Sequence, residues 1–171
     1  MSNSIRIADR DIGLDQPPFL VAEIGINHNG SLDDAVKMIH LAKMSGADAV
    51  KFQKRTPRIC VPMSEWDKPR ETPWGTMSYI EYKECLEFNG REYDTINYAC
   101  KDEDIPWFAS VWDEPSVDFM EHYDPPCYKI GSASLTDIPL LKAVKAKGRP
   151  IILSTGMSTM GEINSAIQVL G

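Results

Sequence analysis

Charged side chains stand inside two consecutive apolar runs that have the length of β-strands. The run at 19–25 reads FLVAEIG and contains Glu23, and the run at 48–53 reads DAVKFQ and contains Lys51. Burying a charge is unfavourable unless the charge is paired or takes part in chemistry. One charge of each sign in neighbouring strands therefore predicts a polar site at the mouth of a sheet. The alternative is a buried Glu23–Lys51 pair with no chemical role.

Polar residues also end the later apolar runs of the chain. In chain order they are Ser110, Lys129, Ser132, Ser154 and Thr155. Lys51 and Gln53 are two residues apart, so they share one face of their strand. Active residues of parallel α/β folds gather at the carboxyl ends of the strands. Lysines and hydroxyls there, with the backbone amides of Gly131–Ser132 and Thr155–Gly156, suit a phosphate or a carboxylate. The sequence therefore predicts a phosphorylated or carboxylated substrate.

The turn after the first run, Gly25 to Gly30, reads GINHNG. Asn27 and Asn29 tolerate left-handed backbone conformations, and the glycines let the backbone approach a ligand closely. We interpret His28 as a turn residue that hydrogen-bonds its own loop rather than as a metal ligand, because no second histidine lies at chelating spacing. No GxGxxG motif follows the first run, so a dinucleotide site is not expected.

Composition narrows the class of protein. The chain has 171 residues, a net charge of −7 and 43% hydrophobic residues, which is ordinary for a globular domain. No run rich in Lys and Arg occurs, so nucleic acid is not an expected partner. The first residues do not have the pattern of a signal peptide, and nowhere do 18 apolar residues follow one another, so we expect no membrane segment.

The four cysteines have no pairing pattern. Cys60, Cys85, Cys100 and Cys127 form no Cys-x-x-Cys motif and no zinc-ligand spacing. Free thiols are typical of a reducing compartment, which favours a cytoplasmic location.

Apolar runs and helical patterns alternate along the chain. The five runs cover residues 19–25, 48–53, 107–112, 127–132 and 150–156. Capping signals predict where the following helices begin. Ser31 with Asp34 resembles a capping box, Pro115 opens a short helix, Thr136 is expected to cap the next, and Thr159 with Glu162 forms a second box.

The second run is followed by a different pattern. Residues 54–77 contain four prolines and two tryptophans, which predicts a long irregular loop, and loops of this length are usually functional. Helical patterns then return in residues 78–88 and 93–104, separated at Asn89–Gly90.

Strand–helix alternation of this kind predicts a parallel sheet with helices outside it. Two architectures fit the pattern. One is a five-stranded doubly wound sheet of flavodoxin-like design, and the other is part of a (β/α)8 barrel, which takes roughly 250 residues when complete.

Four motifs in this order carry a family resemblance. AEIGINHNG, GADAVKFQ, YKIGSAS and ILSTGMS, spread over residues 17–170, resemble the sialic acid synthase family. The resemblance implies a parallel (β/α) barrel of TIM type, of which residues 1–171 supply the first five of eight βα units. Residues 54–77 would then be an active-site loop. The remaining barrel strands and the C-terminal antifreeze-like domain of the family would lie outside this chain.

The resemblance also implies a reaction. Members of the family condense phosphoenolpyruvate with an N-acetylated amino sugar, such as N-acetylmannosamine, to give a nonulosonic acid and phosphate. The enolpyruvate C3 attacks the sugar aldehyde, water adds at C2, and phosphate leaves by C–O cleavage. A divalent metal, usually manganese, polarises the aldehyde. Its histidine ligands lie on later strands, so no metal ligand is expected here, and the complete protein is expected to be a homodimer.

Roles for the residues follow from the resemblance. Lys51 and Lys129, together with Ser110, match positions that hold the phosphoenolpyruvate carboxylate and neighbouring charge. Ser132 and Ser154 match phosphate contacts. Glu23 and Gln53 match positions that face the sugar, and Glu23 is a candidate for proton transfer. Catalytic roles are thus expected for three of these residues (Glu23, Lys51 and Lys129) and substrate binding for four (Gln53, Ser110, Ser132 and Ser154).

Two functional alternatives stay open beside the enzyme. The chain would be a truncated, non-catalytic fragment that keeps only the anion pocket, or an unrelated flavodoxin-like phosphate-binding domain. The acceptor sugar is also open: some relatives place a sugar-contacting asparagine in the long loop, where this chain has Trp74 nearby. Residues 1–171 alone are expected to be inactive.

Overall fold

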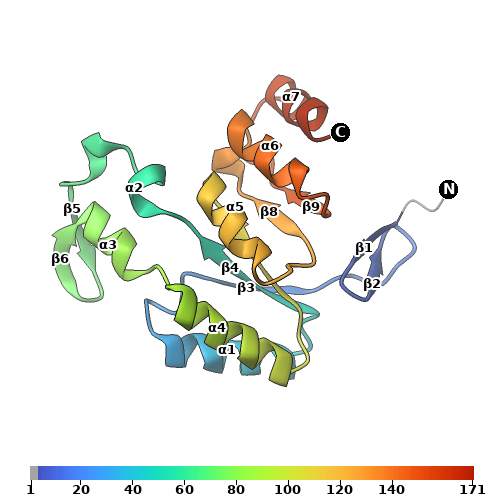
Figure 1. Cartoon of the computed structure of the whole chain (residues 1–171), viewed down its shortest axis with the longest axis horizontal. Helices are drawn as coiled ribbons and strands as arrows, with labels where there is room; N and C mark the ends of the chain where they lie inside the picture. Colours follow the sequence, from blue (N-terminus) through green and yellow to red (C-terminus); the bar gives the residue numbers. More distant parts are fainter. Residues whose placement is uncertain (1–3) are drawn as a thin grey trace.

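A single parallel sheet forms the centre of the molecule (Figure 1). The computed structural model describes residues 4–171. The strands lie in the sheet in chain order: β3 (Val21–Gly25), β4 (Ala49–Lys54), β7 (Trp107–Val111), β8 (Tyr128–Ile130) and β9 (Ile151–Leu153). All neighbouring pairs are parallel. Strictly sequential order excludes the flavodoxin-like sheet, in which the first strand lies inside the sheet, and is the order of a TIM-type barrel.

Helices cover the outer side of this sheet and follow one another around it. They are α1 (Leu32–Met44), α4 (Gly90–Asp102), α5 (Glu114–Glu121), α6 (Ile138–Ala146) and α7 (Met160–Leu170). Contacts join α1 to α4, α5 to α6 and α6 to α7. The chain therefore forms the first five βα units of the barrel, and β3 and β9 are the two edges of the sheet in the described residues.

Side chains alternate between the two faces of each strand. Val50 and Phe52 of β4 point outward and pack in the core between sheet and helices. Their neighbours in the sequence, Ala49 and Lys51, point to the concave side, where Ala49 joins a second, smaller cluster. This period of two means that each strand contributes its apolar residues to the outer core and its polar end to the barrel interior.

An N-terminal hairpin, which the sequence analysis did not predict, covers the end of the sheet at which the strands begin. β1 (Ile5–Ile7) pairs antiparallel with β2 (Arg10–Ile12). Ile7 is buried against three residues near the amino ends of strands, namely Ala49, Phe108 and Cys127. The hairpin therefore covers the apolar layer of the barrel interior opposite the polar strand ends.

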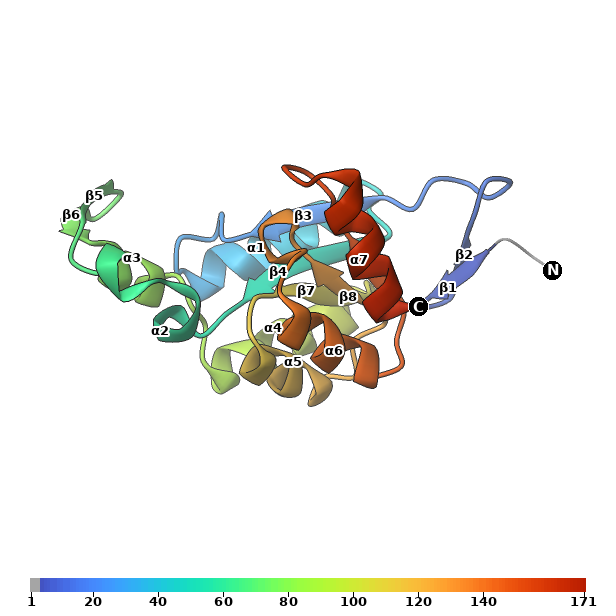
Figure 2. The ribbon, with the colours of Figure 1, turned by 90° about the horizontal axis from the view of Figure 1, so that it is seen from above.

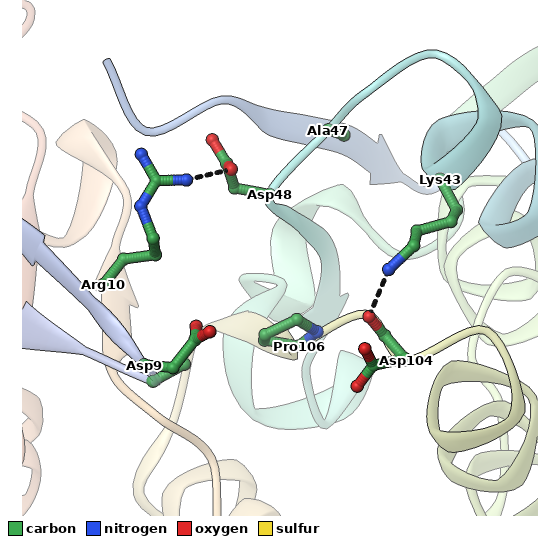
Figure 3. Close-up of a pocket in the computed structure, with 8 residues that line it drawn as sticks. Asp9, Arg10, Lys43, Ala47, Asp48, Asp104 and Pro106 are labelled. Carbon is green, nitrogen blue, oxygen red and sulfur yellow. Dashed lines mark hydrogen bonds and ion pairs between the residues drawn. The ribbon is translucent and has the colours of Figure 1, made fainter. Parts of the chain in front are cut away.

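A polar cavity of about 420 Å³ lies beside this hairpin (Figure 3). Arg10 forms an ion pair with Asp48 there, and Lys43 Nζ donates to the Asp104 carbonyl at 2.5 Å. Asp48 Oδ2 also accepts from the Leu20 backbone N–H at 2.7 Å. These bonds connect the hairpin to the amino ends of the strands, the end of a TIM-type barrel whose residues serve stability rather than catalysis.

The expectation of an irregular loop over residues 54–77 is wrong. The segment contains α2 (Pro57–Cys60), the short 3-10 helix Met63–Glu65, β5 (Pro69–Thr72) and β6 (Gly75–Ser78), and α3 (Tyr79–Cys85) follows directly. β5 and β6 pair as an antiparallel hairpin. Figure 2 shows this hairpin projecting at one end of the molecule, with the β1–β2 hairpin at the other. Pro73 and Trp74 form the turn between the two strands, and Gly75, with φ 100°, begins β6 directly after it. This glycine is a local turn signal that the proline count obscured.

Helix caps agree with the sequence in three of four cases. Ser31 Oγ accepts from the Asp34 N–H at 3.2 Å, α5 carries Pro115 in its first turn, and Thr159 with Glu162 forms a complete capping box. Thr136 is not the cap of α6. Asp137 takes that place, with Oδ1 3.1 Å from the Leu140 N–H, because a carboxylate one residue nearer the helix reaches its third amide.

Candidate active site

Three side chains from three strands meet at the carboxyl end of the sheet. Lys51 Nζ lies 2.6 Å from Glu23 Oε2 and donates to Ser110 Oγ at 2.7 Å. Lys51 and Ser110 are each only 6% exposed. Burial lowers the pKa of Lys51, and the Glu23 carboxylate opposes that change. The structure thus holds a buried cation between a carboxylate and a hydroxyl.

Lys129 stands next to this group. It is paired in register with Ser110, and its Nζ donates to the Ile130 carbonyl at 2.7 Å. The Ser154 N–H donates to the same carbonyl at 3.0 Å, which places Ser154 beside Lys129. Burial lowers the pKa of Lys129, and the positive charge of Lys51 lowers it further, while Glu23 raises it. Lys51 on β4 and Lys129 on β8 therefore flank Ser110 of the intervening strand β7, an arrangement that suits an anion.

Ser132 lies on the loop after β8, at the start of the 3-10 turn Ser132–Ser134. A Cβ placed on Gly156 would be 3.6 Å from Ser132 Cβ and 3.7 Å from its Oγ. The loop after β8 therefore touches the loop after β9. This brings the hydroxyl of Ser132 and the backbone of residues 155–156 to the same rim, as the anion cradle requires.

Gln53 occupies the other side of the mouth, toward β3. It pairs in register with Ser110, and its Oε1 accepts from Arg55 Nη2. A Cβ on Gly25 would lie 2.7 Å from Glu23 Oε1 and 3.3 Å from Gln53 Nε2. Because Gly25 has no side chain, Glu23 and Gln53 both lie against its backbone. A register shift between Glu23 and Gly25 ends the pairing of β3 with β4 at this point.

All seven residues that the sequence singled out thus share one end of the sheet. Their individual roles remain predictions. One detail differs from expectation: the Glu23 side chain is 53% exposed, whereas Lys51 is 7% exposed. Glu23 lies on the edge strand and faces the mouth, so only the lysine of the pair is buried.

Sequence reading missed two polar residues close to the mouth. Arg55 is buried, and its Nε lies 2.8 Å from Glu87 Oε1. Asp113 is 1% exposed and accepts from Thr56, Cys60 and Ser116, which ties the segment after β4 to the start of α5. The signal for Asp113 was available, since Asp before Glu-Pro is a typical helix N-cap. Arg55 carried no such local signal.

The GINHNG turn has the structural role expected of His28. Its Nδ1 accepts from the Gly30 N–H at 3.1 Å, and its ring stacks on Phe88 with centroids 4.1 Å apart. Burial lowers the pKa of His28 to about 4. Asn29 and both glycines adopt positive φ. The close approach at Gly30 is to another part of the chain: a Cβ there would lie 2.4 Å from the Cys85 carbonyl oxygen.

The side chains at this mouth do not form a metal site by themselves. Among residues 4–171, no group of three His, Cys, Asp or Glu side chains lies close enough to hold a metal ion. Glu23, the carboxylate of the Lys51 contact, is already paired with a cation.

Burial raises the pKa of the Cys127 thiol to about 12, so this thiol is not a nucleophile at neutral pH. In the described part of the chain, no helix is long and apolar enough to cross a membrane.

The fold defines a class, namely a partial TIM-type barrel, and two lysines, Lys51 and Lys129, stand at its mouth. The NeuB family model matches residues 38–171. The chain is 35% identical to an N-acetylneuraminate-9-phosphate synthase of Homo sapiens, over 94% of this chain and 45% of that protein. It is 34% identical to an N,N'-diacetyllegionaminic acid synthase of Campylobacter jejuni, over 88% of this chain and 46% of that protein.

A solved structure agrees with these sequence matches. The sialic acid synthetase of Leptospira borgpetersenii, crystallised with citrate, superposes with a TM-score of 0.87 at 27% identity, over 99% of this chain and 55% of that one. The chain therefore belongs to the NeuB family. It spans about half the length of the relatives that it matches.

Proposed function

We propose that this chain is the amino-terminal part, the first five of eight βα units, of the catalytic barrel of a nonulosonic acid synthase. The complete enzyme, meaning this chain joined to the rest of the barrel that its relatives contain, would condense phosphoenolpyruvate with an N-acetylated amino sugar. The products are a sialic acid-type nonulosonic acid and phosphate. The observation that carries the proposal is the pair Lys51 and Lys129, which stand together at the strand ends with Glu23 opposite them.

The two lysines suit the charges of phosphoenolpyruvate. Two neighbouring ammonium groups in a desolvated site repel each other, and a bound carboxylate or phosphate would relieve that repulsion. Lys51, Lys129 and Ser110 would hold the carboxylate side. Ser132 and Ser154, on the loops that meet at Gly156, would hold the phosphate. The citrate bound to the Leptospira relative is likewise a multiply charged carboxylate anion.

Glu23 and Gln53 would face the sugar. In the condensation, enolpyruvate C3 bonds to the aldehyde carbon, and the aldehyde oxygen takes up a proton. Water then adds at C2, and the C–O bond to phosphate breaks. Glu23 is partly exposed at the mouth and paired with Lys51, so it is placed to move a proton at the sugar side, as a general acid or base does.

The metal, the assembly and the location are further parts of this proposal. The family resemblance implies a divalent metal, such as Mn²⁺, but the described residues do not offer a set of ligands for it, so no step is assigned to a metal here. A homodimer and a cytoplasmic location are proposed for the complete enzyme. The relatives make sialic, legionaminic and pseudaminic acids, so N-acetylmannosamine is the first sugar to test rather than a settled substrate.

A non-catalytic fragment is the second candidate. It is favoured by one observation, that the side chains proposed to hold the carboxylate, Lys51, Lys129 and Ser110, all lie within this chain. Such a fragment would still bind phosphoenolpyruvate through the two lysines but would not turn it over.

Calorimetry and an activity assay separate these functions. Phosphoenolpyruvate is titrated into this chain and into its Lys51→Ala and Lys129→Ala variants. Phosphate release from phosphoenolpyruvate, N-acetylmannosamine and Mn²⁺ is measured on the complete enzyme. Binding lost in both variants, together with sugar-dependent phosphate release, supports the synthase. Binding without turnover supports the fragment, and absence of binding contradicts both.

A further inference from the structure

The amide of Gln53 has a neighbour that fixes which way it points. Arg55 Nη2 donates to Gln53 Oε1. A guanidinium has only donors, so the atom facing it must be the amide oxygen. The oxygen and the nitrogen of an amide side chain are told apart by their hydrogen-bond partners, and Arg55 therefore identifies the oxygen of Gln53. The amide nitrogen must then point to the opposite side.

That opposite side is the mouth of the sheet. Gln53 Nε2 and Glu23 Oε1 lie against the same Gly25, at 3.3 and 2.7 Å from the position of an added Cβ. The mouth therefore presents an amide donor beside a carboxylate acceptor. If the amide were turned over, two acceptors would stand side by side there, and a substrate oxygen would find no donor from Gln53.

Arg55 is itself held on several sides. Its side chain is 6% exposed, and its Nε lies 2.8 Å from Glu87 Oε1. The guanidinium also lies over the Trp112 ring, 4.7 Å from its centroid. A planar guanidinium with these contacts is far less mobile than a surface arginine. Arg55 can therefore hold the Gln53 amide in one orientation.

Lys54 provides a natural comparison at the neighbouring position. Its Nζ lies 3.5 Å from the same carboxylate, Glu87, and donates to the Phe88 carbonyl at 3.2 Å. No bond from Lys54 to the Gln53 side chain occurs among the described residues. Lys54 and Arg55 thus share charge and a partner carboxylate, with side chains 14% and 6% exposed, but of these two only Arg55 bonds to the amide.

We propose that Arg55 is a positioning residue that turns the Gln53 NH₂ group toward the amino sugar, where it donates to a hydroxyl or acetamido oxygen. The inference rests on the proposed function for its ligand, because Gln53 is placed at the sugar side there. Arg55 itself does not touch the substrate. Its effect passes through one amide, so it acts on the sugar rather than on phosphoenolpyruvate.

Kinetics on the complete enzyme test this split. Arg55→Met is expected to raise KM for N-acetylmannosamine about tenfold, the value of one hydrogen bond. KM for phosphoenolpyruvate should stay within about twofold. Arg55→Lys, which can still donate to Oε1, should recover part of the loss, and the matched control Lys54→Met should leave both constants unchanged. Equal rises in both KM values, or the same split in Lys54→Met, would overturn the proposal.

Gln53→Glu is the decisive second variant. Glutamate still accepts from Arg55, yet it has no NH₂ group to offer the sugar, so KM for the sugar should rise as in Arg55→Met. Combining both changes should add less than about twofold to Gln53→Glu alone, because both act on one bond. If the rises in KM from the two changes multiply instead, the two residues do not act through the same amide, which contradicts the proposal. If Arg55→Met fails to fold because buried Glu87 keeps only the more distant Lys54 as its partner, the pair Arg55→Met with Glu87→Gln replaces it.

Melting temperatures separate failure of this inference from failure of the proposed function. With Arg55 present, Gln53→Glu should melt at or above the wild-type temperature. The double variant Arg55→Met with Gln53→Glu should melt below Arg55→Met alone. This readout needs no substrate. A melting result as expected, with no sugar activity, would support the orientation and reject the synthase. If Gln53→Glu changes the melting temperature equally with and without Arg55, the proposed orientation of the amide is rejected.

Discussion

Lys51 Nζ lies 2.6 Å from Glu23 Oε2, but the two side chains differ in exposure, at 7% and 53%. The lysine is buried beneath the carboxylate, which faces the open mouth of the sheet. A purely structural pair would gain from burying both partners with their hydrogen bonds satisfied. This arrangement instead keeps the carboxylate accessible to a ligand while the cation beneath it supplies charge.

Removal of either lysine should weaken phosphoenolpyruvate use severely. Loss of one cation from a desolvated anion site is expected to cost about 2–4 kcal/mol. Steady-state kinetics of Lys51→Ala and Lys129→Ala in the complete enzyme measure this effect. The exposed Lys37, whose one ion pair within residues 4–171 is with Asp34 on the helix surface, provides Lys37→Ala as the control. A change below threefold in kcat/KM for phosphoenolpyruvate would refute the assignment.

Glu23→Gln should reduce turnover more than phosphoenolpyruvate binding. The carboxylate lies on edge strand β3, away from the hydroxyls of Ser132 and Ser154 and on the side proposed for the sugar, and acid–base assistance is typically worth about 10²–10⁴-fold. Both kcat and the dissociation constant for phosphoenolpyruvate are to be measured. A variant that keeps nearly full kcat would show that Glu23 is only a partner of Lys51.

Gly30→Ala should destabilise the fold more than Gly46→Ala. Both glycines have positive φ, at 71° and 81°, so each alanine carries the left-handed penalty of about 1–2 kcal/mol. A Cβ on Gly30 would also meet the Cys85 carbonyl oxygen at 2.4 Å, whereas Gly46 has nothing within 4 Å. Overpacking adds about 1–3 kcal/mol. Thermal melting of the two variants should show this order, and equal losses would mean that the contact relaxes freely.

Stability should fall in mild acid because of His28. Burial lowers the pKa of His28 from 6.5 to about 4 in the folded chain. The unfolded chain therefore takes up a proton between these values and the folded chain does not, so stability is lost as pH falls from 6.5 toward 4. His28→Phe keeps the stacking on Phe88 and cannot titrate. Its melting temperature should fall less than that of the wild type between pH 7 and pH 5, and parallel curves would speak against His28.

Residues 1–171 alone should associate and show no manganese-dependent condensation. The edge strands β3 and β9 each have one sheet neighbour among the described residues, and apolar grooves lie beside them. Such edges invite pairing with another chain. Sedimentation should show oligomers that decrease in Leu20→Lys, an exposed residue beside β3, but not in Tyr98→Lys on α4. A monodisperse wild-type monomer with metal-stimulated phosphate release would contradict this expectation.

The sequence was sufficient for the alternation of strands and helices and for the face of each strand that carries the polar residues, but the order of the strands in the sheet came from the structure. Apolar runs of strand length alternate with capped helical patterns, which determines a parallel sheet. The period of two along each strand also determines that Lys51 and Gln53 share a face. These properties are local, because a few adjacent residues determine where a strand ends and where a helix is capped.

Tertiary structure decided which of these residues meet and how they are oriented. The Lys51–Ser110 bond joins residues 59 positions apart, and the role of Arg55 depends on Glu87 and Trp112, which lie on other segments. The exposure of Glu23 follows from the place of β3 at the sheet edge. Such features depend on contacts between distant segments, and no local pattern around Arg55 or Glu23 could have revealed them. The residue types at the strand ends are set by the sequence, whereas the partners and orientations of their side chains are set by the folded sheet.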